Sequence, residues 1–335
     1  MEKKNDAMDP VMAGCLSQME LGKPQSFESL AIIPLFSSNG HSPNYLTLKE
    51  ALEQNLLTIQ EMSEGGSVPH LKAISRAPLP VLILAGEELA GAKQNRVLNT
   101  TILLRIKSET IIPVSCTEQG RWSYVSDKFL DSGVVMSPRL RSAAHCAVAC
   151  SLANSGEYRT DQGEVWSGIR EFSERAGVNS TTGAMRDVYE SKAGDLEKYL
   201  EAFPLLPRQK GMIAIFNGEV VGFDFISLES AFTTLHQKLV KSYAMDAILL
   251  EKKKKTKPSM TGARAFLRGL AQSKVKKYKS IGHGMDHRYE GKGFVGSALV
   301  YRKQAIHTVF FKTQAQEIEP RMAGFRRRMD FIYER

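Results

Sequence analysis

Short apolar runs separated by polar turns dominate the pattern of the first 136 residues. Residues 31–36, 80–86, 99–106 and 110–115 are runs of this kind, and turn-forming residues lie between them. Runs of this length and spacing are typical of strands in a sandwich- or barrel-like sheet. The polar residues 107–109 lie between two of these runs and predict a hairpin loop. The N-terminal half is therefore expected to be rich in β-structure.

From about residue 137 the apolar positions recur every three or four residues instead. Residues 163–176 and 230–250 have this period, which predicts amphipathic helices. Gly177 follows the first of them, at the place of a C-terminal cap. Two further apolar runs flank Asn217 and Gly218, a pair that favours a tight hairpin turn. The whole pattern predicts an α+β fold in which a β-rich N-terminal half packs with a mixed α/β C-terminal half.

The same pattern divides the chain into three segments. Residues 1–28 are polar and without period, and they predict a flexible arm. Residues 29–312 predict a single α+β domain, β-rich over residues 29–136 and mixed over residues 137–312. Residues 313–335 lack an extended apolar face and predict a tail.

Composition places the chain among globular proteins. Of its 335 residues, 42% are hydrophobic and 24% are charged, which excludes a mostly disordered chain or a fibre. No run approaches the roughly 18 apolar residues of a transmembrane helix, and the first residues lack the apolar stretch of a signal peptide. Four scattered cysteines are too few for a disulfide scaffold. We therefore expect a reduced, cytoplasmic protein with no membrane partner.

The net charge of +9 is concentrated in one segment. Residues 251–303 hold 15 Lys and Arg against three Asp and Glu, a local balance of +12. Such a segment indicates an anionic partner, and nucleic acid is one candidate. Residues 252–257, however, include four consecutive lysines, and runs of like charge are typical of a solvated loop that neither folding nor ligand binding requires. Basicity alone leaves both interpretations open.

A polar block, residues 86–96, follows one of the apolar runs; we call it the first block. Glu87 and Glu88 lie near its start, and they point to opposite sides if the backbone is extended. The block ends with several kinds of hydrogen-bond donor: Lys93, Gln94, Asn95 and Arg96. Side chains of these types can hold a phosphate, a ribose or a carboxamide. The alternative is a surface loop held by Glu–Arg and Glu–Lys pairs, each of which contributes little.

A second block, residues 116–122, follows the run at residues 110–115. It contains Glu118, Arg121 and Trp122. A Trp can stack on a purine or ribose face, and an adjacent Arg can bind phosphate. In the alternative interpretation Trp122 fills the core and Arg121 pairs with Glu118. Cys116 is expected to be a small buried hydrophobe rather than a nucleophile, because no His lies near it in sequence to act as a base.

The two blocks resemble the ARG and Rhodanese-Phosphatase-superfamily-associated Protein domain family. Members of that family carry a similar Gly-Glu pair and Gly-x-Lys-Gln-x-Arg stretch, followed by a β pair and then by Cys-x-Glu-x-Gly-Arg-Trp. The resemblance extends from about residue 29 to residue 312 and is sharp across the two blocks. It implies a β-rich start and a mixed α/β remainder. It also implies a role near NAD or ADP-ribose metabolism, because the family is associated with ADP-ribosylglycohydrolases and phosphatase-like proteins.

Together these observations predict a cytoplasmic protein whose two blocks meet in one cleft and bind a nucleotide or ADP-ribose-type ligand. If the protein is an enzyme, which stays open, hydrolysis is the most natural reaction. Glu87, Glu88 or Glu118 would then act as general base or metal ligand, and the cofactor stays unknown, with a divalent metal as one option. The predicted ligand-binding residues are Lys93, Gln94, Asn95, Arg96, Arg121 and Trp122. A non-catalytic binding module, or a nucleic-acid-binding protein acting through residues 251–303, is the alternative.

Overall fold

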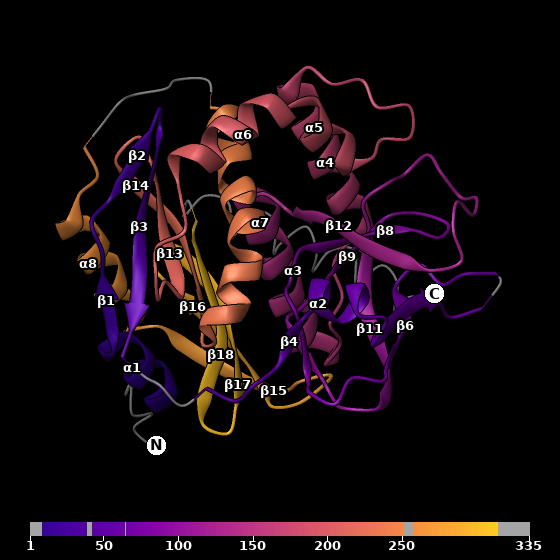
Figure 1. Cartoon of the computed structure of the whole chain (residues 1–335), viewed down its shortest axis with the longest axis horizontal. Helices are drawn as coiled ribbons and strands as arrows, with labels where there is room; N and C mark the ends of the chain where they lie inside the picture. Colours follow the sequence, from indigo (N-terminus) through magenta and orange to yellow (C-terminus); the bar gives the residue numbers. More distant parts are fainter. Residues whose placement is uncertain (1–8, 39–41, 64, 251–256, 314–335) are drawn as a thin grey trace.

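A computed structural model describes residues 9–38, 42–63, 65–250 and 257–313. Within these ranges the chain forms eight helices and 18 strands, which confirms the predicted α+β class (Figure 1). The helices are α1 (Pro10–Ser17), α2 (Leu48–Glu53), α3 (Pro138–Ser155), α4 (Gln162–Ala176), α5 (Met185–Ser191), α6 (Ala193–Ala202), α7 (Glu229–Ile248) and α8 (Met260–Leu270).

Twelve of the described strands precede α3, and the other six follow α6. Those of the first part are β1 (Met19–Leu21), β2 (Gln25–Phe27), β3 (Leu30–Ser37), β4 (Leu46–Thr47), β5 (Leu57–Glu61), β6 (His70–Ser75), β7 (Val81–Ile83), β8 (Glu87–Gly91), β9 (Arg96–Leu98), β10 (Ile102–Leu104), β11 (Ser108–Cys116) and β12 (Phe129–Val135). Those of the second part are β13 (Gly211–Phe216), β14 (Glu219–Ile226), β15 (Lys274–Lys279), β16 (Met285–Gly291), β17 (Phe294–Tyr301) and β18 (Gln304–Lys312).

The largest sheet joins strands from both parts of the chain. Its strand order is β1-β3-β13-β14-β18-β17-β16-β15, with β2 also paired to β3, and every pairing is antiparallel. β3 is buried along its apolar run and pairs with β13, with Ile33 opposite Ile213. The β-rich first part and the mixed second part therefore share one curled sheet and are not separate layers.

The other strands of the first part form two smaller sheets. One has the order β12-β8-β9-β11-β6-β5 and the other the order β10-β7-β4. Residues 107–109 do not form the predicted hairpin, because β10 pairs with β7 while β11 pairs with β6 and β9. The physical reason lies in the polar residues that precede β10. Asn99 and Thr100 are buried and donate hydrogen bonds to Tyr158 O and Asp286, so the chain leaves the β11 sheet at this point.

α1, β1 and β2 lie within residues 1–28, the segment for which the sequence predicts a flexible arm. α1 contacts β18, and β1 and β2 pair with β3. The carboxylate of Asp9, at the start of α1, accepts hydrogen bonds from the Tyr289 hydroxyl (2.8 Å) and lies 2.7 Å from Lys277 Nζ. The polar composition of residues 1–28 gives no indication of these long-range pairings. Residues 1–8 and the predicted tail at 314–335 lie outside the described residues.

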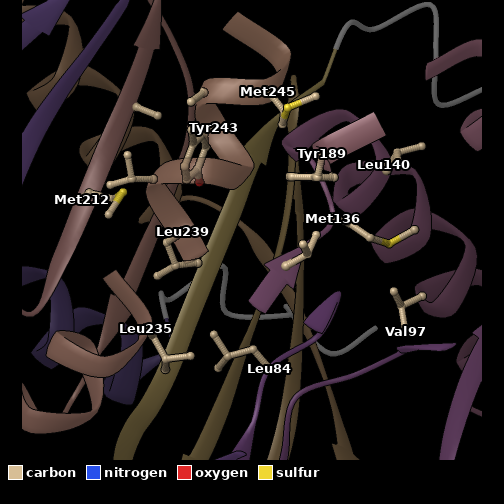
Figure 2. Packing of buried hydrophobic residues seen from close by; sticks show 14 of the residues in the cluster. Leu84, Val97, Met136, Leu140, Tyr189, Met212, Leu235, Leu239, Tyr243 and Met245 are labelled. Carbon is tan, nitrogen blue, oxygen red and sulfur yellow. The ribbon is translucent and has the colours of Figure 1, made fainter. Parts of the chain in front are cut away.

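The long helix α7 lies between the large sheet and the strands β4 and β12 of the smaller sheets (Figure 1). Its apolar residues recur every three or four positions, so one stripe of the helix faces the core. Leu235, Leu239 and Tyr243 of this stripe belong to one buried cluster with Met212 of β13 and with Leu84, which follows β7 (Figure 2). The core therefore spans the space between the sheets. α1 and α8 cover the opposite face of the large sheet.

A buried ion pair crosses this core. Arg141 of α3 donates two hydrogen bonds to Asp224 of β14, at 3.0 and 2.6 Å, and both side chains have no exposed surface. Asp224 also accepts a hydrogen bond from Tyr243 of α7 (2.7 Å) and lies 3.3 Å from His307 Nε2 of β18. Burial alone would raise the pKa of Asp224, but the Arg141 guanidinium and His307 lower it below its usual range. The pair therefore stays ionised and joins four elements.

We expect Asp224→Asn to lower the free energy of unfolding by about 3–5 kcal/mol, because it leaves the Arg141 charge buried without its partner. Urea unfolding measures this loss. Glu219→Gln on the same strand is the matched control, since Glu219 pairs with Lys312 at the surface, with 74% of its side chain exposed. It should cost less than about 1 kcal/mol. Equal losses in the two variants would contradict the importance of the buried pair.

Candidate functional site

The two blocks lie against each other, and the cleft that the sequence predicts between them stays a prediction. β9 pairs with the end of β11, with Arg96 opposite Cys116, so the loop that precedes β9 lies beside the loop that follows β11. The Asn95 backbone N–H donates to Glu118 Oε2 (3.2 Å), and Arg121 Nη2 donates to the same oxygen (2.6 Å). One carboxylate oxygen of the second block therefore binds both blocks.

Arg121 connects the two blocks through several hydrogen bonds. Its Nη1 donates to Ala92 O at 2.7 Å and to Ser123 O at 3.0 Å, and its Nη2 also donates to Asn95 Oδ1 at 3.3 Å. Only 14% of its side chain is exposed. The guanidinium of Arg121 therefore donates its hydrogen bonds to acceptors within the protein. Its pairing with Glu118 is the one that the alternative interpretation of the second block predicts.

Glu118 is fixed from a third side by the segment before α5. It forms an isolated antiparallel bridge with Ala184, and the Gly120 N–H donates to Thr182 O at 2.7 Å. A Cβ on Gly120 would lie 2.9 Å from Thr182 Cα, so the two segments approach closely only with glycine at this position. Burial raises the pKa of Glu118, but hydrogen bonds from Arg121, Asn95 and Thr182 outweigh it and lower that pKa. Glu118 is ionised at neutral pH.

Arg96 and Gln94 lie beneath the surface. Arg96 is fully buried, and its Nη1 donates to Gln94 O (3.2 Å) and Gln94 Oε1 (3.0 Å). Its Nη2 lies 3.6 Å from Glu61 Oε1, and its guanidinium lies 5.8 Å from the centroid of the Trp122 ring. Arg96, which the sequence predicts to bind a ligand, therefore lies beneath the Trp122 ring. Its positive charge is on the buried side of that ring.

Glu87 and Glu88 point in different directions, as expected for neighbours on a strand. Glu87 faces the core, where its carboxylate accepts a hydrogen bond from the Leu84 N–H and pairs with Lys238 of α7 at 2.7 Å. Lys238 also pairs with Asp131 of β12 at 2.7 Å. The structure thus places Glu87 in a buried triad that holds α7 against β8 and β12, not beside Glu118 and Arg121.

Glu88 faces the second block from inside the protein. Its Oε1 accepts a hydrogen bond from Thr117 Oγ1 (2.7 Å), while its Oε2 has no hydrogen-bond partner in the described part of the chain. Burial raises the pKa of Glu88 to about 7, and the hydroxyls of Thr117 and Ser132 oppose this only in part. Glu88 and the ionised Glu118 are close enough to interact electrostatically. A fully buried carboxyl of this kind contacts a ligand only if its surroundings open.

Lys93 and Trp122 of the two blocks form an aromatic surface with Tyr124, which follows the second block; we define the aromatic surface as these three residues. Lys93 Nζ lies 5.3 Å from the centroid of the Trp122 ring and 5.1 Å from that of Tyr124, and it donates to Gly65 O at 3.0 Å. Trp122 is 49% exposed and Tyr124 is 47% exposed. Tyr124 is not among the residues predicted from the sequence, although its position two residues after Trp122 was a signal.

The remaining predictions concern other parts of the chain. Of the basic segment, residues 251–256 lie outside the described residues, so most of the lysine run is not placed. Lysines at 274, 276, 277 and 279 are exposed on the edge strand β15, whereas Arg288 is buried and pairs with Asp286 at 2.6 Å. Within the described ranges, no three His, Cys, Asp or Glu side chains gather as they would around a metal ion. No described helix has the length and apolar character needed to span a membrane.

The sequence profile of the ARG and Rhodanese-Phosphatase-superfamily-associated Protein domain matches residues 18–311. The chain belongs to this family. The matched region extends from just before β1 almost to the end of β18, so the family domain includes both small sheets, the large sheet and the helices between them. A search of the curated proteins and of the solved structures finds no significant match.

We expect Glu118→Gln to lower the free energy of unfolding of this family member by about 1.5–3 kcal/mol, the contribution of a hydrogen bond to a charged group. The amide keeps an oxygen for the Asn95 N–H but loses the charge that holds Arg121. Thermal and urea unfolding measure the loss. If Glu118 were instead a catalytic base, the variant would keep its stability and lose turnover, typically by about 10²–10⁴-fold.

We expect the stability of the wild-type protein to fall relative to Glu88→Gln as the pH rises from about 4.5 to 7. Glu88 has a folded-state pKa of about 7 against a reference value of 4.5, so over this range the folded state keeps a proton that the unfolded state releases. A difference of this size corresponds to roughly 3 kcal/mol. Urea unfolding of both proteins across this range measures it. Parallel pH profiles would show that Glu88 is not held protonated.

Proposed function

We propose that this protein binds a nucleotide or ADP-ribose-type ligand on its aromatic surface. The observation that carries the proposal is the position of Lys93, whose ammonium lies about as close to the exposed ring of Trp122 as to that of Tyr124. Exposed aromatic rings are stacking platforms for bases, and a cation between them can pair with the phosphate that accompanies a base. Family membership supports this class of ligand by association.

The residues below this surface support the rings and add charge. Arg121 and Glu118 hold the second block against the first, and Arg96 lies under Trp122. Because these groups are tied to one another before a ligand arrives, Trp122 is held in position and loses little side-chain freedom on binding. Gln94, Asn95, Arg96 and Arg121 are therefore proposed to position the surface, and Lys93 and Trp122 to touch the ligand.

We propose binding without turnover, rather than hydrolysis, as the function of this site. Two of the three predicted catalytic acids are engaged in ion pairs, Glu87 with Lys238 and Glu118 with Arg121. The third, Glu88, is fully buried. Burial also raises the pKa of the Cys116 thiol to about 11, so it is not a ready nucleophile. A general base must lie within hydrogen-bond reach of its substrate, and all three carboxylates are buried.

A second candidate partner is nucleic acid, as the charge of residues 251–303 indicates. Four lysines of the edge strand β15 are exposed, and so are Arg264 and Arg268 of the neighbouring helix α8. Binding here would weaken steeply with salt, because contacts to phosphates release counterions. We also propose a reducing, cytoplasmic location, which the absence of disulfides among Cys15, Cys116, Cys146 and Cys150 supports.

We expect ADP-ribose, NAD or AMP to quench the fluorescence of Trp122, and Trp122→Ala to weaken binding by about 5- to 150-fold, equivalent to a stacking free energy of about 1–3 kcal/mol. Trp122→Phe should recover part of this loss because it keeps a ring. Titration in a Trp166→Phe background isolates the signal, since the chain has two tryptophans.

The matched control is Tyr278→Phe, on β15 and outside the aromatic surface, which should bind as the wild type does. Equal affinity of the wild type and Trp122→Ala for all three ligands would overturn the proposed site. Hydrolysis of ADP-ribose by the wild type that is lost in Glu88→Gln would instead favour the enzyme interpretation.

A further inference from the structure

A cavity lies between α3 and α4, and none of the residues of the aromatic surface lines it. Its volume is about 340 Å³, within the range of small-molecule sites. Leu140, Ala143 and Ala147 of α3 line one wall, and Val165 and Phe172 of α4 line the other. The nucleotide-type ligand proposed above does not account for this space.

The packing of the two helices explains why the cavity exists. A Cβ on Gly168 of α4 would lie 2.9 Å from Leu140 Cδ2, so the helices approach closely at this point. Elsewhere along the contact α3 presents alanines and the thiols of Cys146 and Cys150, which are too small to fill the gap to α4. The result is an apolar slot with one aromatic ring in its wall.

A polar end closes this slot. Asp246 of α7 is 6% exposed, and its Oδ2 accepts a hydrogen bond from the Arg139 N–H at the start of α3 (2.9 Å). Its Oδ1 makes no hydrogen bond of normal geometry with any described residue, and neither does the Ser137 hydroxyl, which is fully buried. Burial raises the pKa of Asp246, and the Arg139 N–H and Ser137 hydroxyl nearby oppose this rise. Asp246 Oδ1 and the Ser137 hydroxyl thus lie at the polar end of the cavity without a hydrogen bond of normal geometry.

The charge of the lining favours a cation. Four acidic side chains line the cavity against two basic ones, a net charge of −2 in a protein whose net charge is +9. Both basic groups are already engaged: Arg139 pairs with Glu171 at 2.6 Å, and Arg175 donates to Leu249 O at 2.9 Å. An anionic ligand would meet Asp246 at the polar end, whereas an ammonium would find an acceptor there.

We propose that this cavity binds a small aromatic amine, with its ring system between α3 and α4 and its ammonium group donating to Asp246 Oδ1. The apolar walls take the ring, Phe172 contacts it, and the ammonium donates to the buried Asp246 Oδ1. This site is independent of the aromatic surface, so each proposal can fail without the other.

Three compounds that share the indole ring test the proposal on the full chain. Tryptamine carries an ammonium group, indole-3-propionate carries a carboxylate, and 3-methylindole has no charged group. Calorimetry should give tryptamine a Kd at least about tenfold lower than that of indole-3-propionate, with 3-methylindole between them. Tryptamine should also slow alkylation of the tryptic peptide 142–159, which holds Cys146 and Cys150, and leave Cys15 and Cys116 unaffected.

Two variants tie the binding to the cavity. Ala147→Phe fills the slot and should abolish binding of all three compounds, whereas Ala153→Phe, on the exposed side of the same helix, should leave binding unchanged. Asp246→Asn keeps an oxygen for the Arg139 N–H and should remove the preference for tryptamine over 3-methylindole. Three results would overturn the proposal: no tryptamine binding at millimolar concentration, an affinity for indole-3-propionate as high as for tryptamine, or binding that survives Ala147→Phe. The first two use the wild-type protein and do not depend on the folding of a variant.

Discussion

The ion pair between Arg141 and Asp224 is the interaction on which the arrangement of the sheets depends. It connects α3 to the large sheet, and Tyr243 and His307 connect the same carboxylate to α7 and β18. His307 in turn lies 2.9 Å from Thr101 Oγ1, in the segment between β9 and β10. Two charges buried without this geometry would be costly. The network therefore fixes how the small sheets, the central helix and the large sheet sit relative to one another.

The first block takes part in this arrangement as well as in the proposed site. Gly86 has φ of +84°, and a Cβ there would lie 3.1 Å from Arg141 Cγ, so this glycine permits the close approach of the arginine. Glu87 holds α7 through Lys238. The start of the first block thus faces the core, whereas Lys93, three residues before the end of this block, reaches the surface. One polar stretch serves structure on one side and, as we propose, ligand binding on the other.

Local signals in the sequence predicted local structure well. The hairpin at Asn217 and Gly218 has positive φ at both residues, and α4 ends at Gly177 in the left-handed conformation, as the residue types indicate. The meeting of the two blocks could also be predicted, because both adjoin apolar strands. Long-range pairing could not. The residues around Asp9 give no indication of its contact with Tyr289, and those around Glu87 give none of its pairing with Lys238. The structure of residues 9–27 and the burial of the predicted acids therefore depend on the three-dimensional fold.

The pairing of β3 with β13 has a consequence for how the chain is made on the ribosome. β3 ends at Ser37 and its partner β13 begins at Gly211. Most of the chain must therefore be synthesised before β3 can pair with β13. Contacts of such sequence separation slow folding, and a waiting strand with an open edge is prone to pair with other chains. β1 and β2 are synthesised before β3 and pair with it, so they can cover part of Leu30–Ser37 during this interval.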